Sequence, residues 1–341
     1  MGDAAIGLWK ALVLVFAAAV VVSMGLIAVL RPAFARYAMA RPNARSSHTV
    51  PTPQGGGMAV VAATLIAAWL GAALLDAGLS TLEWLALSAG TIVLALTGAV
   101  DDVRGLGAAP RLLIQVFAVG IVIAALPHDF SVVPQLPWPI ERALILLGGV
   151  WFVNLVNFMD GLDWMTVAET VPVTGGVALL GVAAGASPGT VMVSVALLGA
   201  IIGFAPFNRP MARLFLGDVG SLPIGLLLGW LMLMLAGRDN LAAALLLPLY
   251  YLADATITLG RRLIRREPVW QAHRNHFYQR ATDGGFSVEE IVVRVFVLNL
   301  ALAGLALITA IEPDPHVDLV TVTLGGALVA WLLVTFERGK R

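Results

Sequence analysis

The sequence predicts an all-α protein that crosses a membrane many times. Of its 341 residues, 59% are hydrophobic and only 12% are charged, and the mean hydropathy is +0.90. A soluble domain carries about 25% charged residues, so the main solvent of this chain is expected to be lipid. The net charge of zero gives no indication of nucleic-acid binding. Because the chain has no cysteine, disulfides and thiolate chemistry are excluded, and any metal must be held by oxygen or imidazole ligands.

Apolar runs recur along the whole chain and predict about eleven transmembrane helices, although ten would also fit. Several runs are shorter than the ~20 residues that a perpendicular helix needs, so their ends are soft. No linker or repeat divides the chain, which predicts a single membrane domain over residues 1–341. The expected spans are roughly 8–30, 58–75, 84–100, 111–126, 140–157, 171–186, 189–205, 221–236, 241–260, 291–311 and 318–336.

The basic residues predict the orientation of these helices. If alternate loops lie in the cytoplasm, starting after the first span, the cytoplasmic side holds 18 of the 21 basic residues. The positive-inside rule then places the N-terminus outside and the C-terminus in the cytoplasm, which requires an odd number of spans. A cleaved signal peptide is disfavoured, because only Lys10 precedes the first apolar run while Arg31 and Arg36 follow it.

Acidic, amide and histidine side chains gather in the inner loops, which the positive-inside rule does not require. The first inner loop ends in Gly55, Gly56 and Gly57, whose backbone N–H groups could surround a phosphate. The alternative is a flexible loop that caps the second span.

The second inner loop begins with Asp101 and Asp102, which suit Mg²⁺ or a general base. The alternative is a solvated pair with Arg104 as its partner. Arg111 and Gln115 follow on one helical face and could hold a phosphate, although an interfacial arginine would look the same.

The third inner loop has acids and amides but no basic residue, which indicates an external cation or a donor-rich ligand as its partner. If the fifth helix continues, Asn154 and Asn157 share a face. Asp160 then lies one turn further, and Gly161 breaks the helix and places Asp163 in a turn.

The fourth inner loop contains Gly217-Asp218-Val219-Gly220-Ser221 at an expected helix start. Ser221 could cap this helix, whose free N–H groups would attract an anion, and Asp218 beside that anion suggests a bridging metal. The alternative is a turn capped by Asp218 itself.

The last inner loop carries an arginine cluster and a pair of histidines. His273 and His276 could share a helical face, and with Arg274 between them phosphate binding is favoured over zinc. Attraction to anionic lipids would also explain about half of the arginines. Asp254, inside the ninth span, is either a site residue or part of an internal ion pair.

Taken in order, these motifs resemble the polyprenyl-phosphate N-acetylhexosamine-1-phosphate transferases (glycosyltransferase family 4), whose relatives include the phospho-MurNAc-pentapeptide transferase. The resemblance covers nearly the whole chain. It implies transfer of a sugar phosphate from a UDP-N-acetylhexosamine to undecaprenyl phosphate at the cytoplasmic face of a bacterial inner membrane, with Mg²⁺, or alternatively Mn²⁺, as cofactor. Besides these substrates and membrane lipid, no nucleic acid is expected as a partner, and a homodimer would be compatible with the family.

The resemblance also assigns roles to the residues that match. Asp218 is expected to bind the metal, with Asn157 and Asp160 beside it, and Asp101 and Asp102 to engage or deprotonate the lipid phosphate. Substrate-binding roles are expected for the residues of the remaining motifs: Asn157, Asp160, Asp163, Arg111, His273, Arg274, His276, Gly55 and Gly56.

Three departures from the family pattern bear on the substrate. Gln54 stands where relatives usually have Lys or Arg, and Trp164 where many have Gly. The last loop lacks the triple histidine of the peptidoglycan enzyme, which favours the branch that starts O-antigen or other surface polysaccharides. A membrane transporter is the rival hypothesis, but Asp254 is the one mid-span acid and the halves show no repeat.

Overall fold

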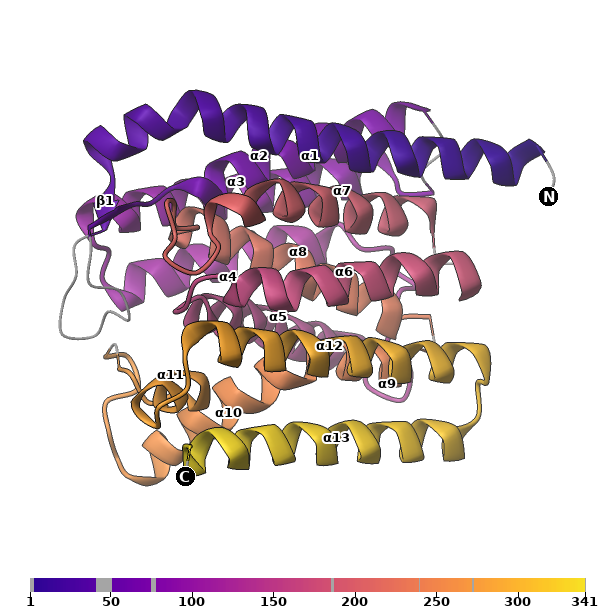
Figure 1. The fold of residues 1–341 in the computed structure, drawn as a ribbon. Helices are drawn as coiled ribbons and strands as arrows, with labels where there is room; N and C mark the ends of the chain where they lie inside the picture. The colour runs from indigo at the N-terminus through magenta and orange to yellow at the C-terminus, as the bar shows by residue number, and fades with distance from the viewer. Residues whose placement is uncertain are drawn as a thin grey trace.

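The computed structural model describes residues 3–40, 51–74, 78–184, 187–238, 240–271 and 273–340, and it is a bundle of long helices (Figure 1). The all-α prediction is confirmed: within these ranges the strands are β1 (Met39–Ala40) and β2 (Thr52–Pro53), an antiparallel pair. The two chain ends lie at opposite ends of the bundle, as an odd number of spans requires. Arg41, Arg45 and His48 of the first inner loop lie outside the described residues.

Nine helices in the described residues are long and apolar enough to cross a membrane, which confirms a polytopic membrane fold. The first expected span lies within a longer helix, and the sixth begins six residues earlier than expected, at Met165. The nine are α1 (Asp3–Tyr37), α2 (Gly56–Leu74), α3 (Thr81–Arg104), α5 (Trp138–Met159), α6 (Met165–Ala184), α7 (Pro188–Phe204), α8 (Asp218–Ala236), α12 (Val288–Ile311) and α13 (Pro315–Arg338).

The other two expected spans correspond to shorter helices. The fourth is α4 (Ala108–Ala124), which has 17 residues. The ninth is divided into α9 (Leu241–Leu246) and α10 (Leu249–Ile264), because Pro248 between them has no N–H to continue the helical ladder. A 3₁₀ turn, η1 (Ala205–Phe207), follows α7, and the short helix α11 (Phe277–Asp283) follows α10.

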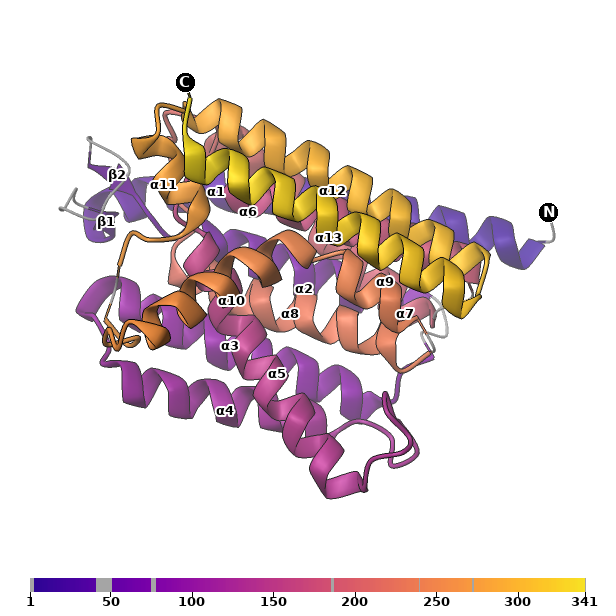
Figure 2. The same cartoon turned by 90° about the horizontal axis from the view of Figure 1, so that it is seen from below.

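Helix α8 lies at the centre of the bundle, with α4 on one side and α12 and α13 on the other (Figure 2). Its first turn touches two other helices backbone to backbone. A Cβ atom on Gly57 of α2 would overlap the Cα atom of Gly220, and one on Gly98 of α3 would overlap the carbonyl of Asp218. Glycines at these points therefore allow α2 and α3 to hold the start of α8 closely.

Candidate active site

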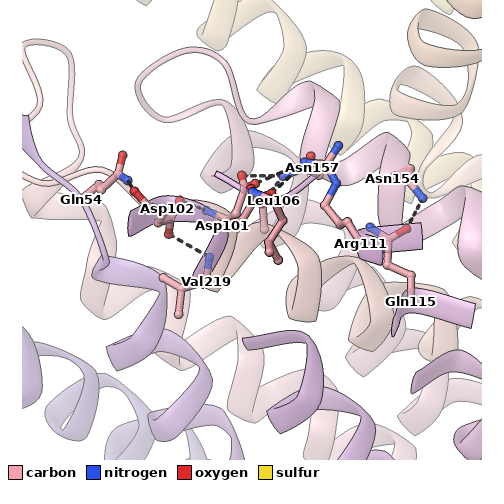
Figure 3. Close-up of polar contacts among 11 residues, drawn as sticks. Gln54, Asp101, Asp102, Leu106, Arg111, Gln115, Asn154, Asn157 and Val219 are labelled. Atoms are coloured by element: carbon pink, nitrogen blue, oxygen red, sulfur yellow. Dashed lines mark hydrogen bonds and ion pairs between the residues drawn. The ribbon is translucent and has the colours of Figure 1, made fainter. Parts of the chain in front are cut away.

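The start of α8 is capped by a side chain from another helix. The carboxylate of Asp102, near the end of α3, accepts hydrogen bonds from the backbone N–H groups of Asp218 (2.9 Å) and Val219 (3.1 Å) (Figure 3). A carboxylate at this position satisfies free N–H groups and is favoured by the helix dipole. Gly217 precedes the helix with φ 77°, and a Cβ atom there would lie 2.6 Å from the Asp102 carboxylate.

This arrangement corrects the capping expected from the sequence. Ser221 does not cap α8, because the helix already begins at Asp218 and Ser221 lies one turn inside it. The Ser221 hydroxyl instead accepts a hydrogen bond from Asn157 Nδ2 (2.9 Å). The side chain of Asp218 does not cap the helix either, so its carboxylate can face the neighbouring helices.

Asp101 and Asp218 are joined by one arginine. The guanidinium of Arg111 lies 2.9 Å from Asp101 Oδ2 and 3.7 Å from Asp218 Oδ2. Asp101 also accepts a hydrogen bond from the backbone N–H of Leu106 (Figure 3). The partner of the aspartate pair is therefore Arg111, and Arg104 makes no such contact in the described part of the chain. Arg111 is partly exposed, so a phosphate could reach it. Because the guanidinium already lies near two carboxylates, a bound phosphate would have to share it with them.

The amides of α5 connect α4, α5 and α8. Asn157 donates through Nδ2 to Asp218 Oδ1 (2.8 Å), and Asn154 donates to Oε1 of the buried Gln115 (2.6 Å) (Figure 3). Gln115, expected to hold a phosphate with Arg111, uses its oxygen within the protein, whereas its buried Nε2 has no hydrogen-bond partner among the described residues. In this arrangement Asn157 presents its nitrogen to Asp218, so its predicted role as a metal ligand would require the amide to turn.

Asp160 and Asp163 follow α5 as the sequence predicts, because the helix ends at Met159 and Asp163 lies in a turn. Asp160 accepts a hydrogen bond from Thr166 Oγ1 (2.5 Å), and Asp163 accepts one from the backbone N–H of Ala212 (3.0 Å). Burial raises the pKa of Asp160 to about 8, and the negative charges of Asp218, Asp102 and Asp163 add to this effect. The site therefore has more negative charge than its own groups neutralise.

The composition of this site fits a magnesium ion. In the described residues no three His, Cys, Asp or Glu side chains are arranged as a complete metal cage. Mg²⁺ rarely uses such a cage: it prefers oxygen ligands, keeps several waters and binds through one or two carboxylates together with substrate phosphates. Asp218 and Asp160 supply carboxylates of this kind, and their mutual repulsion would be relieved by a cation.

The glycine loop contacts the segment that leads into α8. The backbone N–H groups of Gly56 and Gly57 donate to the carbonyls of Phe215 and Leu216, both at 2.9 Å. The N–H of Gly56 is thus not free for the phosphate contact expected from the sequence. A Cβ atom on Gly56 would lie 2.5 Å from the ring of Phe204, which explains the glycine by packing. Gln54 donates to the carbonyl of Asp102 (3.1 Å) and so links the glycine loop to the end of α3.

A second aspartate holds α11. Asp254 of α10 is 0% exposed and accepts hydrogen bonds from the backbone N–H groups of Phe277 (3.1 Å) and Tyr278 (3.2 Å). His276 Nδ1 lies 3.1 Å from the same carboxylate. Of the two alternatives left open for Asp254, the structure favours the internal partner.

The expectation that the two histidines share a helical face is wrong. His276 is the residue that precedes α11, and His273 lies before it in the loop, with the two rings stacked at 5.0 Å between centroids. The pKa of His273 is lowered to about 4, mainly by burial and also by the nearby His276 and Arg262. Near pH 7 the His273 ring is therefore neutral. Arg274 lies 3.3 Å from Asp283 and donates to Thr282 (2.7 Å).

Close packing brings α11 against the third inner loop. The Tyr278 hydroxyl donates to the carbonyl of Phe158 (2.9 Å), and a Cβ atom on Gly161 would overlap this hydroxyl. Trp164 adopts φ 63°, a conformation that favours glycine, and its backbone N–H donates to Asn208. Sequence reasoning missed the roles of Tyr278 and Asn208. The Gly161 and Asn208 positions carried a signal, but their partners are distant in the chain.

An apolar cavity of about 400 Å³ lies further along α5 and α8, and none of the clustered aspartates lines it. It lies between α4, α5, α8 and α9, and its walls include Val119, Phe152, Leu226 and Trp230. On α8 its lining begins at Gly225, about two helical turns after Asp218, and the cavity extends from there toward the loop of Val132 and Val133. An apolar chain could lie in this cavity with a polar end at the aspartates.

The segment that carries most of the site also matches a known family. The model of glycosyl transferase family 4 matches residues 84–236, from α3 to the end of α8. This part of the chain, somewhat less than half of it, is therefore similar to glycosyl transferase family 4. The family 4 match includes Asp101, Asp102, Asn157, Asp160, Asp163 and Asp218, whereas α10 and α11 lie beyond it.

Individual members of the family extend the similarity to most of the chain. The protein is 26% identical over 301 residues to a probable undecaprenyl-phosphate N-acetylglucosaminyl 1-phosphate transferase of Bacillus subtilis, covering 82% of this chain and 81% of that protein. It is 27% identical over 327 residues to a decaprenyl-phosphate N-acetylglucosaminephosphotransferase of Mycobacterium tuberculosis, covering 86% and 80%. A phospho-N-acetylmuramoyl-pentapeptide-transferase of Synechococcus is 28% identical over 254 residues, covering 64% and 67%.

Proposed function

We propose that this protein transfers N-acetylhexosamine 1-phosphate from a UDP-sugar to undecaprenyl phosphate, giving undecaprenyl-diphosphate-sugar and UMP. The observation that carries the proposal is the cluster of aspartates that α3, α5 and α8 bring together within the family 4 segment. The apolar cavity further along α5 and α8 supports a polyprenyl acceptor, because its walls can cover an isoprenoid chain. The names of the relatives support the same class of acceptor and sugar.

In the proposed reaction, an oxygen of the lipid phosphate attacks the sugar-bound phosphorus of the donor. A new P–O bond forms, the bond from that phosphorus to the bridging oxygen breaks, and UMP leaves with the electron pair. A phosphate monoester is already largely ionised near pH 7, since its second pKa is ≈ 6, so a strong base is hardly needed. Positioning and charge neutralisation should account for most of the rate.

The residues of the site have separate parts in this mechanism. Asp218 and Asp160 would hold Mg²⁺, which supplies positive charge to the diphosphate when bound. Asp102 fixes the first turn of α8 and with it the position of Asp218. Asp101 orients Arg111, to which we assign a contact with the lipid phosphate beside Asp218. We assign hydrogen bonds with the donor to neutral His273 and to Arg274, on the side of α11.

The proposed setting is the cytoplasmic face of a bacterial inner membrane, where the product would start a surface polysaccharide. The donor is proposed to be UDP-GlcNAc or a related UDP-N-acetyl sugar. The charge distribution supports the orientation, because 18 of the 21 basic residues lie on the side of the aspartates under the expected topology.

The test is release of UMP by the purified full-length protein. UMP should appear only when undecaprenyl phosphate, Mg²⁺ and a suitable UDP-N-acetylhexosamine are all present, and a screen of UDP-GlcNAc and its dideoxy relatives would identify the donor. A protein that releases no UMP with any donor of this class would contradict the proposal.

The metal-binding role of Asp218 has a separate test. Asp218→Asn should lower the rate by at least about 10²-fold, because it removes a fixed charge from the point where charge must be neutralised. Asp129→Asn, the same chemical change in an exposed outer loop, should have a normal rate. A near-normal rate for Asp218→Asn would refute the role.

A further inference from the structure

A basic pocket lies at the C-terminal end of α10, and none of the clustered aspartates lines it. Its volume is about 130 Å³, and it is formed by α10, the loop after it and α11. Four of its six lining residues are arginines, and none is acidic. The lining residues are Thr258, Arg261, Arg262, Arg265, Asn275 and Arg280.

The arginines of this pocket exceed their acidic partners. Glu337 of α13 lies 2.8 Å from Arg261 and 3.1 Å from Arg280, and Glu267 lies 3.0 Å from Arg262. Arg265 has no carboxylate partner within the described part of the chain. Four arginines less two glutamates leave a net charge of +2, which attracts an anion and is sufficient to balance the single negative charge of a phosphodiester.

The pocket is built by buried contacts, so its shape does not depend on exposed side chains alone. The side chain of Arg262 is 6% exposed and donates to the carbonyls of Pro268 (2.9 Å) and Gln271 (3.2 Å). These hydrogen bonds fold the loop after α10 back onto the helix. The guanidinium of Arg261 lies 4.7 Å from the centre of the Phe277 ring, which fixes a second arginine against α11.

Exposed apolar side chains next to the pocket indicate where its ligand comes from. Leu263 is 57% exposed, Ile264 85% and Trp270 73%, and all three are close in sequence to Arg262 and Arg265. Large apolar side chains beside arginines are typical of the membrane–water interface, where tryptophan lies at the level of the headgroups. A free anion would gain nothing from these side chains, whereas the chains of a lipid would cover them.

We propose that this pocket binds the phosphate of an anionic membrane phospholipid. The ion pairs of this pocket differ from those among the aspartates: they run to α13 through Glu337, whereas those of the aspartates join α3, α4 and α8. Thr258, one of the lining residues, also contacts Asp254, which holds α11. A bound headgroup would therefore stabilise the joint between α10 and α11 at the membrane surface. The inference does not depend on the transferase reaction.

The experiment measures lipid binding to the purified full-length protein by native mass spectrometry. Phosphatidylglycerol and phosphatidylcholine are added separately, and the wild type should retain phosphatidylglycerol in preference. Arg265→Ala should weaken this binding about fivefold, since one arginine near an anionic lipid surface contributes about 1 kcal/mol. Arg266→Ala is the matched control, because it removes the same charge from the adjacent position, which does not line the pocket.

The outcomes separate a built site from general attraction. Selective loss in Arg265→Ala, repeated in Arg265→Gln, supports the proposal. Equal loss in Arg265→Ala and Arg266→Ala would show only a basic surface and would overturn it. Inorganic phosphate is the competitor: if millimolar phosphate displaces the lipid completely, or if phosphatidylcholine binds equally well, a lipid headgroup is the wrong ligand.

Discussion

Asp102 and Asp254 make the same contact in two different surroundings. Each carboxylate accepts hydrogen bonds from two consecutive backbone N–H groups at the start of another helix, α8 for Asp102 and α11 for Asp254. Asp254 is fully buried, with His276 and two hydroxyl groups as its further partners. Asp102 lies among other carboxylates. The same contact, a carboxylate that caps the start of another helix, can therefore hold two helices together in a buried contact, as Asp254 does, or support an open, charged site, as Asp102 does.

Loss of the buried Asp254 cap should destabilise the fold more than loss of the Asp102 cap. Asp254→Ala leaves the buried N–H groups of Phe277 and Tyr278 without their acceptor, which should cost about 2–5 kcal/mol in the free energy of unfolding. Thermal unfolding in detergent measures the loss, with Asp129→Ala as an exposed control. An unchanged unfolding temperature would break the comparison, because Asp254 would then not hold α11.

Loss of the Asp102 cap should lower the activity more than the stability. Asp102→Asn keeps one acceptor oxygen but removes the charge at the first turn of α8, and we expect UMP release to fall about 10- to 100-fold, as for supports of metal ligands. The unfolding temperature should change less than in Asp254→Ala. If Asp102→Asn lost stability without losing activity, the two aspartates would be joints of the same kind.

The contact between α11 and the third inner loop links the two regions. Gly161→Ala would place a methyl group onto the Tyr278 hydroxyl, and overpacking of this kind costs about 1–3 kcal/mol. The double variant Gly161→Ala, Tyr278→Phe removes the overlapping oxygen and should recover part of the stability and of the UMP release. The comparison would need revision if the double variant were no better than Gly161→Ala.

A dependence of stability on pH should mark the charged region through Asp160. The pKa of Asp160 is about 8 in the folded protein, against an ordinary value of 3.8. Between these values the folded protein binds the proton more tightly than the unfolded chain, so stability should fall as the pH rises from about 4 to about 8. In EDTA, the unfolding temperature should follow this course. Asp160→Asn should flatten it, and an unchanged slope in that variant would assign the dependence to another group.

Much of the fold could be predicted because a helix in lipid needs a continuous apolar run, which is visible in the local sequence. Each span is a continuous apolar run, and the end of α5 before Gly161 follows from a single residue. The division of the ninth span was missed although Pro248 was visible, because apolarity alone continues through the proline. The length of α1 was underestimated because its last turns, up to Tyr37, are polar enough to read as a loop.

The residues of the candidate site could be predicted, but many of their partners could not. Asp101, Asp102 and Asp218 stand out by type and position. That Asp102 caps α8, that Arg111 joins Asp101 to Asp218 and that Asp254 caps α11 are contacts between separate helices. No local pattern encodes such pairs, so the local alternative, Ser221 as the cap, was preferred and was wrong.

The glycines around the first turn of α8 limit how the protein can be changed. Gly57, Gly98 and Gly220 leave no room for even a methyl group, so this part of the scaffold cannot accept mutations that would reshape it. Anyone who wishes to redirect the protein to another sugar should leave these positions untouched. A mutant library would be better placed in the loop between α10 and α11 and around Met211, where side chains are exposed and the backbone is not wedged between helices.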